Sequence, residues 1–258
     1  CGSGSCPGRA GYHHSWDFIP GPELSQRCCS VQAAIGAVNA VAFDISAACA
    51  GFIFAMNIVE GFFKAGIYKT ALIIGAETLS KVTDWSDRGT CVLFGDGAGA
   101  AVLKAEETGI IDMMMGADGT KGDVLACTSR TVGNFLTGTK PELGFMTMDG
   151  QEVFKFAVRK VPESVMELLQ RTGTKKEDIK YYVLHQANER IIEAAARRLK
   201  EPMEKFPMTI SQFGNTSTAS IPLLLDDMIQ KDMLKRGDKI IMSGFGAGMT
   251  WGAVLMEW

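Results

Sequence analysis

The strongest constraint on this chain is one cysteine at a predicted junction between a strand and a helix. Cys49 follows residues 38–45, which are typical of a buried strand, and precedes residues 53–66, where apolar side chains recur at helical spacing. The free N–H groups and dipole of a first helical turn favour thiolate over thiol, and the small neighbouring residues would admit a substrate carbonyl. The pattern predicts a nucleophile, with a buried structural cysteine as the alternative.

Composition narrows the class of protein. With 258 residues, 47% of them hydrophobic, the chain can bury a large core. It has no apolar run long enough for a membrane span and no apolar core of a signal peptide, and its seven cysteines are too irregular for a disulfide framework. The net charge of -3 argues against nucleic-acid binding. We therefore expect a soluble cytoplasmic protein without nucleic-acid or membrane partners.

The first residues look unlike the rest of the chain. Residues 1–17 are mostly small and polar, start without methionine and show no apolar period, which predicts an atypical, disordered tract. Four potential zinc ligands lie there, but their spacing matches no familiar zinc finger, so we expect no metal site; they are Cys1, Cys6, His13 and His14. The remaining chain divides at the polar stretch 106–109 into a first half, 18–106, and a second half, 107–258.

Both halves alternate strands and helices. In the first half we expect a helix at 28–35 and a strand at 70–75 buried on both faces, which completes a βαβ unit around Cys49. Residues 91–103 read as two short strands joined by a glycine-rich loop at 95–99. This loop loosely resembles a dinucleotide-binding fingerprint, but the sequence continues as a strand instead of opening a helix, so we reject nucleotide binding.

The second half has more regular periodicity. We expect strands at 110–115, 178–184, 239–242 and 249–257, and helices at 153–172, 189–200 and 221–234, with a kink at Pro162. We expect residues 120–148 to form loops over the sheet, and residues 244–248 to form a glycine-rich turn. The two halves look built alike, which indicates an α/β fold of two similar units.

Two polar residues complete a possible site with Cys49. His185 ends a predicted strand and lies outside the N-terminal tract, although it could instead cap the next helix or satisfy a core carbonyl. Asn215 follows a glycine and could be only a turn residue or an N-cap. Together, the cysteine, histidine and asparagine make an acyl-transfer site plausible.

Five ordered motifs identify a family resemblance that covers about residues 18–258. They are Asp-Ile-Ser-Ala-Ala-Cys-Ala-Gly-Phe around Cys49, Phe-Gly-Asp-Gly-Ala-Gly-Ala from Phe94, His-Gln-Ala-Asn from His185, Gly-Asn-Thr-Ser from Gly214, and Gly-Phe-Gly-Ala-Gly-Met-Thr-Trp-Gly ending at Gly252. The chain resembles the β-ketoacyl-acyl-carrier-protein synthase III enzymes of the thiolase-like superfamily. The resemblance implies a five-layered αβαβα fold, a homodimer and an acyltransferase without a cofactor.

The resemblance also implies a reaction and its residues. Cys49 would take the acyl group of a short acyl-CoA, and decarboxylation of malonyl-acyl-carrier-protein, assisted by His185 and Asn215, would give the 3-oxoacyl product that initiates fatty acid synthesis. Backbone N–H groups of Cys49 and Ala247 would form the oxyanion hole. Substrate contacts would come from Arg88, Phe94 and Asn188. Basic residues that suit an acidic carrier protein, or that form only a solvated face, are Arg190, Arg197 and Arg198.

The match departs from the family ahead of Cys49. That stretch is shorter than in the family by roughly two βα units, so we expect an N-terminal half that is truncated or altered and lacks some coenzyme A contacts. One alternative is a catalytically impaired remnant that acts only by association. Another is a related starter-unit polyketide or quinolone synthase. A thiolase is disfavoured, because residues 246–248 carry no second cysteine.

Overall fold

Two four-stranded sheets organise the chain. The computed structural model describes residues 10–15, as backbone only, together with residues 27–127, 136–140 and 144–258. Strands follow the order β2-β1-β3-β4 in the first sheet and β5-β10-β9-β8 in the second. The chain passes from the first sheet to the second between β4 and β5, where the boundary at 106–109 was predicted.

The first sheet holds the strands of the N-terminal half, β1 (Ala10–Ser15), β2 (Val41–Ile45), β3 (Thr70–Glu77) and β4 (Gly97–Lys104). β1 lies between β2 and β3 and is parallel to both, while β4 is antiparallel to β3. The prediction of a disordered tract over 1–17 is therefore wrong for Ala10–Ser15. A strand between two partners is held by backbone hydrogen bonds, which need no apolar period in its side chains.

The second sheet holds β5 (Ile110–Ala117), β8 (Ile179–Leu184), β9 (Lys239–Gly246) and β10 (Thr250–Glu257). β10 pairs antiparallel with β5 and β9, and β8 is parallel to β9. All four of these strands were predicted; β9 is almost fully buried, whereas β8 leaves Lys180 exposed and Tyr181 half-buried.

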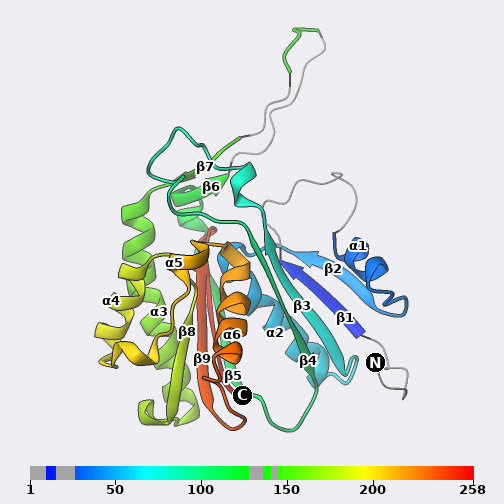
Figure 1. Ribbon diagram of the computed structural model, residues 1–258, viewed down its shortest axis with the longest axis vertical. Coiled ribbons are helices and arrows are strands. Elements are labelled where there is room, and N and C mark those ends of the chain that lie inside the picture. Colours follow the sequence, from blue (N-terminus) through cyan, green and yellow to red (C-terminus); the bar gives the residue numbers. More distant parts are fainter. Residues whose placement is uncertain (1–9, 16–26, 128–135, 141–143) are drawn as a thin grey trace.

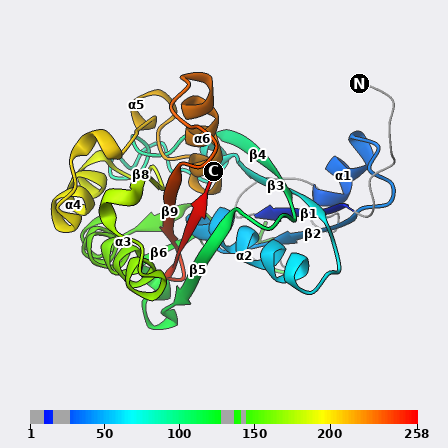
Figure 2. The ribbon, with the colours of Figure 1, turned by 90° about the horizontal axis from the view of Figure 1, so that it is seen from below.

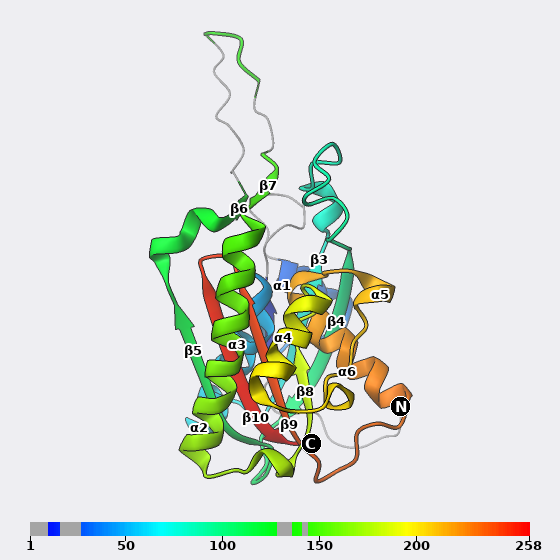
Figure 3. The same ribbon diagram turned by 90° about the vertical axis from the view of Figure 1, so that its left-hand side faces the viewer.

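Helices alternate with the sheets in five layers, as predicted (Figures 1, 2 and 3). The central layer contains α2 (Gly51–Lys64), which contacts strands of both sheets, and α6 (Ser220–Gln230), which contacts β4 and β8. The outer layers are α3 (Gly150–Thr172) with α4 (Glu189–Leu199) on the second sheet, and α1 (Arg27–Ala34) on β1 and β2. None of the described helices is both long and apolar enough to span a membrane.

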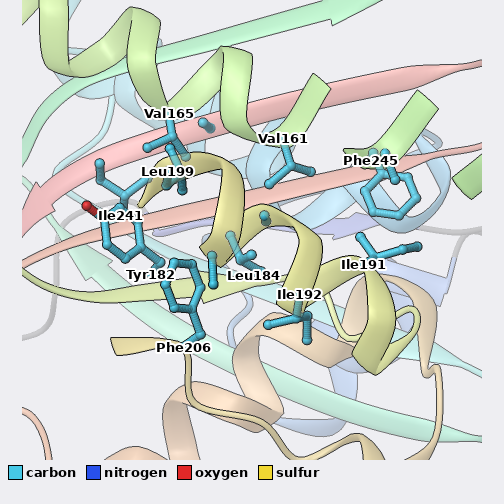
Figure 4. Close-up of a cluster of buried hydrophobic side chains, with 14 of the residues drawn as sticks. Val161, Val165, Tyr182, Leu184, Ile191, Ile192, Leu199, Phe206, Ile241 and Phe245 are labelled. Carbon is cyan, nitrogen blue, oxygen red and sulfur yellow. The ribbon is translucent and has the colours of Figure 1, made fainter. Parts of the chain in front are cut away.

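Two hydrophobic clusters fill the spaces between these layers. One lies between the two sheets around α2 and α6, and the other lies between the second sheet and α3 and α4. Figure 4 shows part of the second cluster, where Tyr182 of β8 stacks on Phe206 with ring centroids 4.8 Å apart. This packing fixes β8 and β9, the strands that lead to the site.

The ends of α3 follow from local sequence. Asp149 caps the first turn by accepting hydrogen bonds from the N–H groups of Gln151 and Glu152, and Gly173 ends the helix in the left-handed conformation with φ 66°. The helix continues through Pro162 to Thr172, and the kink there stays a prediction. Among the shorter elements are β6 (Leu125–Cys127), β7 (Met146–Met148) and α5 (Ile210–Phe213), so the loops predicted over 120–148 include a two-stranded sheet.

Two strand predictions in the first half need correction. The strand predicted at 38–45 begins only at Val41, because Ala37 and Ala40 close a turn, and its position at the sheet edge leaves it partly exposed. β3 is fully buried on one face but only half-buried on the other.

The two short strands predicted within 91–103 are one strand, β4, preceded by a turn. The Asp87 side chain accepts hydrogen bonds from the Gly89 N–H and the Thr90 hydroxyl, which favours a turn over a strand in the residues that follow. Phe94 then makes a single parallel bridge to Asn215. Of the loop predicted at 95–99, residues 97–99 already belong to β4, and no helix opens there, as predicted.

Candidate active site

Cys49 lies in a 3-10 turn, Ala48–Ala50, that directly precedes α2. Its side chain is buried, and Ala48 before it has a positive φ of 46°, which is uncommon for a residue with a Cβ. Two threonines from the second half hold this turn. The Thr218 hydroxyl donates to the Ala48 carbonyl at 2.9 Å, and the Thr250 hydroxyl donates to the Ala47 carbonyl at 3.1 Å.

The end of β9 passes against the cysteine turn. A Cβ at Gly246 would lie 2.5 Å from the backbone nitrogen of Cys49, and a Cβ at Gly244 would lie 3.3 Å from its carbonyl oxygen. Both glycines belong to β9, so the turn predicted at 244–248 is in fact shorter. These glycines allow close approach of two backbones instead of turning the chain.

His185 follows β8 and is 2% exposed. Its backbone N–H donates to the Ser243 carbonyl, and its Nδ1 lies 2.6 Å from the Ser220 hydroxyl oxygen. Burial lowers the pKa of His185 to about 3. The imidazole is therefore neutral at physiological pH.

Asn215 is fixed through both its backbone and its side chain. Its N–H donates to the Leu93 carbonyl at 2.8 Å, and its own carbonyl accepts from the Gly95 N–H at 2.9 Å. The side-chain oxygen accepts from the Ser217 N–H at 2.9 Å. Because that oxygen is engaged, the amide NH₂ is the group of the side chain that can donate to a ligand.

A cavity of about 190 Å³ brings the three predicted residues together. Cys49, His185 and Asn215 all line it, with Phe94 and Asn188 among the other lining residues. A second cavity, of about 70 Å³, also reaches Cys49 and is lined by mostly apolar side chains together with Ala247. The two predicted oxyanion-hole residues, Cys49 and Ala247, therefore line the same small cavity. The cysteine stands where two cavities meet.

A larger cavity lies elsewhere. It measures about 610 Å³ and is bordered by β4, α6 and the C-terminal Trp258, and none of the predicted site residues lines it. Size alone would not favour the cavity at Cys49, but the cavity of about 610 Å³ brings together no nucleophile with a histidine or an amide. The chemistry therefore favours the cavity at Cys49.

Sequence comparisons show the family to which this chain belongs. The 3-oxoacyl-acyl-carrier-protein synthase III family matches residues 43–119, and the C-terminal part of the same enzyme matches residues 169–258. A β-ketoacyl-acyl-carrier-protein synthase III of Clostridium novyi is 53% identical over 93% of this chain and 74% of the relative. The chain belongs to the β-ketoacyl-acyl-carrier-protein synthase III family. The synthase III of Clostridium acetobutylicum is 51% identical over 89% of this chain and 71% of that protein.

Solved structures of the synthase III family share the fold. The 3-oxoacyl-acyl-carrier-protein synthase III of Aquifex aeolicus superposes with a TM-score of 0.87 at 42% identity, covering 96% of this chain and 77% of that one. The Thermus thermophilus synthase III gives the same TM-score at 39% identity and the same coverage. The predicted thiolase-like fold is therefore confirmed.

The positions of the other predicted site residues give less support to their predicted roles. Asn188 caps α4 through its side-chain oxygen, which accepts from the Arg190 N–H at 2.9 Å, and so its amide NH₂ remains for a ligand. Arg88 is exposed and lines neither cavity at Cys49. Arg190, Arg197 and Arg198 are exposed on α4, where Arg197 pairs with Glu193. Of the possible zinc ligands, Cys1 and Cys6 lie outside the described residues, and the side chains of His13 and His14 are not described.

Sequence reasoning missed the residues that hold the site. Thr218, Ser220 and Thr250 support the cysteine turn and the histidine, and none of the three was predicted as a site residue. A signal existed for all three, because Thr250 lies within the glycine-rich motif ending at Gly252, and Thr218 and Ser220 follow the Gly-Asn-Thr-Ser motif within three residues.

Proposed function

We propose that Cys49, His185 and Asn215 carry out the synthase III reaction, which condenses a short acyl-CoA primer with malonyl-acyl-carrier-protein and initiates fatty acid synthesis. One observation carries the proposal. A thiol, a neutral imidazole and a carboxamide, all buried and brought from distant parts of the sequence, line a single cavity of about 190 Å³. The roughly 50% identity to several synthase III relatives supports the same reaction.

The first half-reaction is acyl transfer to the cysteine. The Cys49 thiolate attacks the thioester carbonyl of the acyl-CoA, a C–S bond forms, and the C–S bond to coenzyme A breaks as its thiolate leaves. Backbone N–H groups of Cys49 and Ala247 hold the oxyanion that develops on the carbonyl oxygen. The acyl chain would occupy the apolar cavity of about 70 Å³ beside both residues.

The second half-reaction makes the new carbon–carbon bond. Loss of CO₂ from the malonyl group leaves its bonding electron pair as an enolate, whose oxygen needs neutral hydrogen-bond donors. His185 and Asn215, which line the same cavity as Cys49, supply these donors. The carbanion then attacks the acyl-cysteine carbonyl, the 3-oxoacyl product leaves on the carrier protein, and the thiolate is restored.

The peripheral contacts are also proposals. Phe94 lines the acyl and substrate cavities, and Asn188 donates its amide NH₂ to the pantetheine arm. Arg88 contacts coenzyme A from an exposed loop whose next residue, Gly89, lines the substrate cavity. The carrier protein would dock on the basic end of α4 at Arg190, Arg197 and Arg198.

A homodimer and a cytoplasmic location are proposed on the family resemblance. For the dimer, the exposed side chains of Ile35, Val38 and Val41 give the α1–β2 region an apolar surface that a second copy could cover. Light scattering of the purified chain measures its molecular mass in solution, and a monomeric mass at micromolar concentration would contradict the homodimer.

The central test follows the covalent intermediate. Incubation with acetyl-CoA should add one acetyl group, which peptide mass spectrometry should locate at Cys49 and not at the half-buried Cys91 or Cys127. Addition of malonyl-acyl-carrier-protein should then release the 3-oxoacyl product. An unlabelled Cys49 would refute the proposal and favour a remnant that acts by association. Labelling by an aromatic or branched primer alone would instead favour a polyketide or quinolone synthase.

A further inference from the structure

The hydrogen-bond partner of the histidine ring suggests a further role. We propose that Ser220 is a positioning residue whose hydroxyl donates to Nδ1 of His185, from which it lies 2.6 Å, and thereby keeps the ring proton on Nε2. This inference rests on the proposed function, in which His185 must donate a hydrogen bond to the enolate oxygen. Ser220 is then the group that makes Nε2 of His185 a hydrogen-bond donor.

The direction of the hydrogen bond follows from the neighbours of the hydroxyl. The Gln186 N–H, which can only donate, points to the same oxygen over a longer distance of 3.4 Å. Within the described part of the chain, no other hydrogen bond involves this hydroxyl. Ser220 is 2% exposed, so its proton needs an acceptor inside the protein, and Nδ1 is the one available.

The tautomer of His185 follows from this direction. A ring nitrogen that accepts a hydrogen bond carries no proton, and a neutral imidazole carries one proton in total. Because burial keeps the ring neutral, the proton is on Nε2. In the other tautomer, Nε2 would present a lone pair to a negatively charged oxygen, which would oppose decarboxylation.

The same short segment also orients the second donor. Ser217 uses its backbone N–H to hold the Asn215 side-chain oxygen, and Ser220 begins α6 one turn later. The stretch from Asn215 to Ser220 thus directs an amide NH₂ and an imidazole N–H toward one cavity. A loop that looks merely polar in sequence sets both donors of the second half-reaction.

The test separates the two half-reactions in Ser220→Ala. We expect its rate of 3-oxoacyl product formation to fall about tenfold or more, since a correctly oriented donor is worth that much or more. Acetylation of Cys49 by acetyl-CoA should change less than about twofold, because His185 acts only in the second half-reaction. Ser220→Thr, which keeps the hydroxyl, should recover part of the loss. Ser164→Ala is the matched control, since it removes an equally buried hydroxyl that bonds to the Lys160 carbonyl in α3.

A direct measurement covers the case in which Ser220→Ala does not fold. ¹⁵N NMR of histidine-labelled protein reports which ring nitrogen carries the proton, and His185→Gln identifies the signal. Wild-type protein should show Nε2–H alone, and Ser220→Ala should show both tautomers. An Nδ1–H ring in the wild type, or an unchanged condensation rate in a folded Ser220→Ala, would overturn the inference. Failure of the proposed function would instead appear as an unlabelled Cys49 in the wild type.

Discussion

The two halves of the molecule support their reactive groups in different ways. Cys49 of the first half lies on a turn whose carbonyls are held by Thr218 and Thr250 of the second half. His185 is held within the second half, by Ser220 and by the pairing of its backbone with β9. The nucleophile therefore depends on contacts between the halves, whereas the histidine depends on a local network. This difference predicts that acyl transfer and decarboxylation can be impaired separately.

Removing the nucleophile should have the largest effect. Cys49→Ala should lower product formation by at least about a thousandfold, because no other described residue that lines the cavity of about 190 Å³ carries a thiol. Decarboxylation of malonyl-acyl-carrier-protein should persist, since His185 and Asn215 remain in place. Release of CO₂ and of the 3-oxoacyl product are measured in parallel. Loss of both would show that the two halves do not act separately.

Removing either donor should give the converse pattern. His185→Ala and Asn215→Ala should each lower the condensation rate roughly a hundredfold, which is typical for loss of one oxyanion donor. Acetylation of Cys49, followed by mass spectrometry in single turnover, should stay near the wild-type rate. A matching fall in acetylation would mean that these residues also act in the first half-reaction.

A smaller effect, on acyl transfer, is expected when a methyl group is added at the contact between the two halves. In Gly246→Ala the new methyl would lie 2.5 Å from the Cys49 nitrogen, so the turn must shift, at a cost of about 1–3 kcal/mol in unfolding free energy. We expect acetylation about tenfold slower and a lower Tm. Gly61→Ala in α2 is the control, because nothing lies within 4 Å of the added methyl. Equal acetylation rates and Tm values for the two variants would show that the contact between β9 and the cysteine turn does not support acyl transfer.

The buried histidine should make stability depend on pH. Its pKa is about 3 in the folded protein against 6.5 for an ordinary histidine, so the unfolded chain binds the extra proton first. The contribution of His185 to the free energy of unfolding is complete above pH 6.5 and is lost as the pH falls from 6.5 toward 3. Urea unfolding of the wild type should show a steeper loss over this window than His185→Gln. Parallel curves would contradict a neutral buried ring.

The smallest effect is expected at the surface. Arg190→Glu should raise the KM for malonyl-acyl-carrier-protein a few fold, because an exposed charge acts mainly by attraction at long range. The effect should shrink in high salt, and acetylation by acetyl-CoA should be unchanged. Lys69→Glu makes the same change of charge on the first half and serves as the control. An equal effect of both variants would indicate a general effect of net charge.

Much of the fold could be predicted because its signals are local. The helical period predicted a helix at 153–172, which matches α3 (Gly150–Thr172) to within a few residues. The continuous apolar run at 70–75 predicted β3, and the five motifs identified the family whose fold the structure shares. The same motifs pointed to Cys49, His185 and Asn215, which the structure brings to one cavity.

The sequence by itself determined which reactive groups the chain carries and the order of its elements. Only the tertiary structure decided that Ala10–Ser15 pairs between two strands, that Gly246 lies against Cys49, and that Ser220 meets the histidine ring. The physical reason is that backbone pairing and hydrogen bonds between distant residues leave no periodic trace in the sequence. A serine or a glycine looks the same in a loop as it does beside a nucleophile.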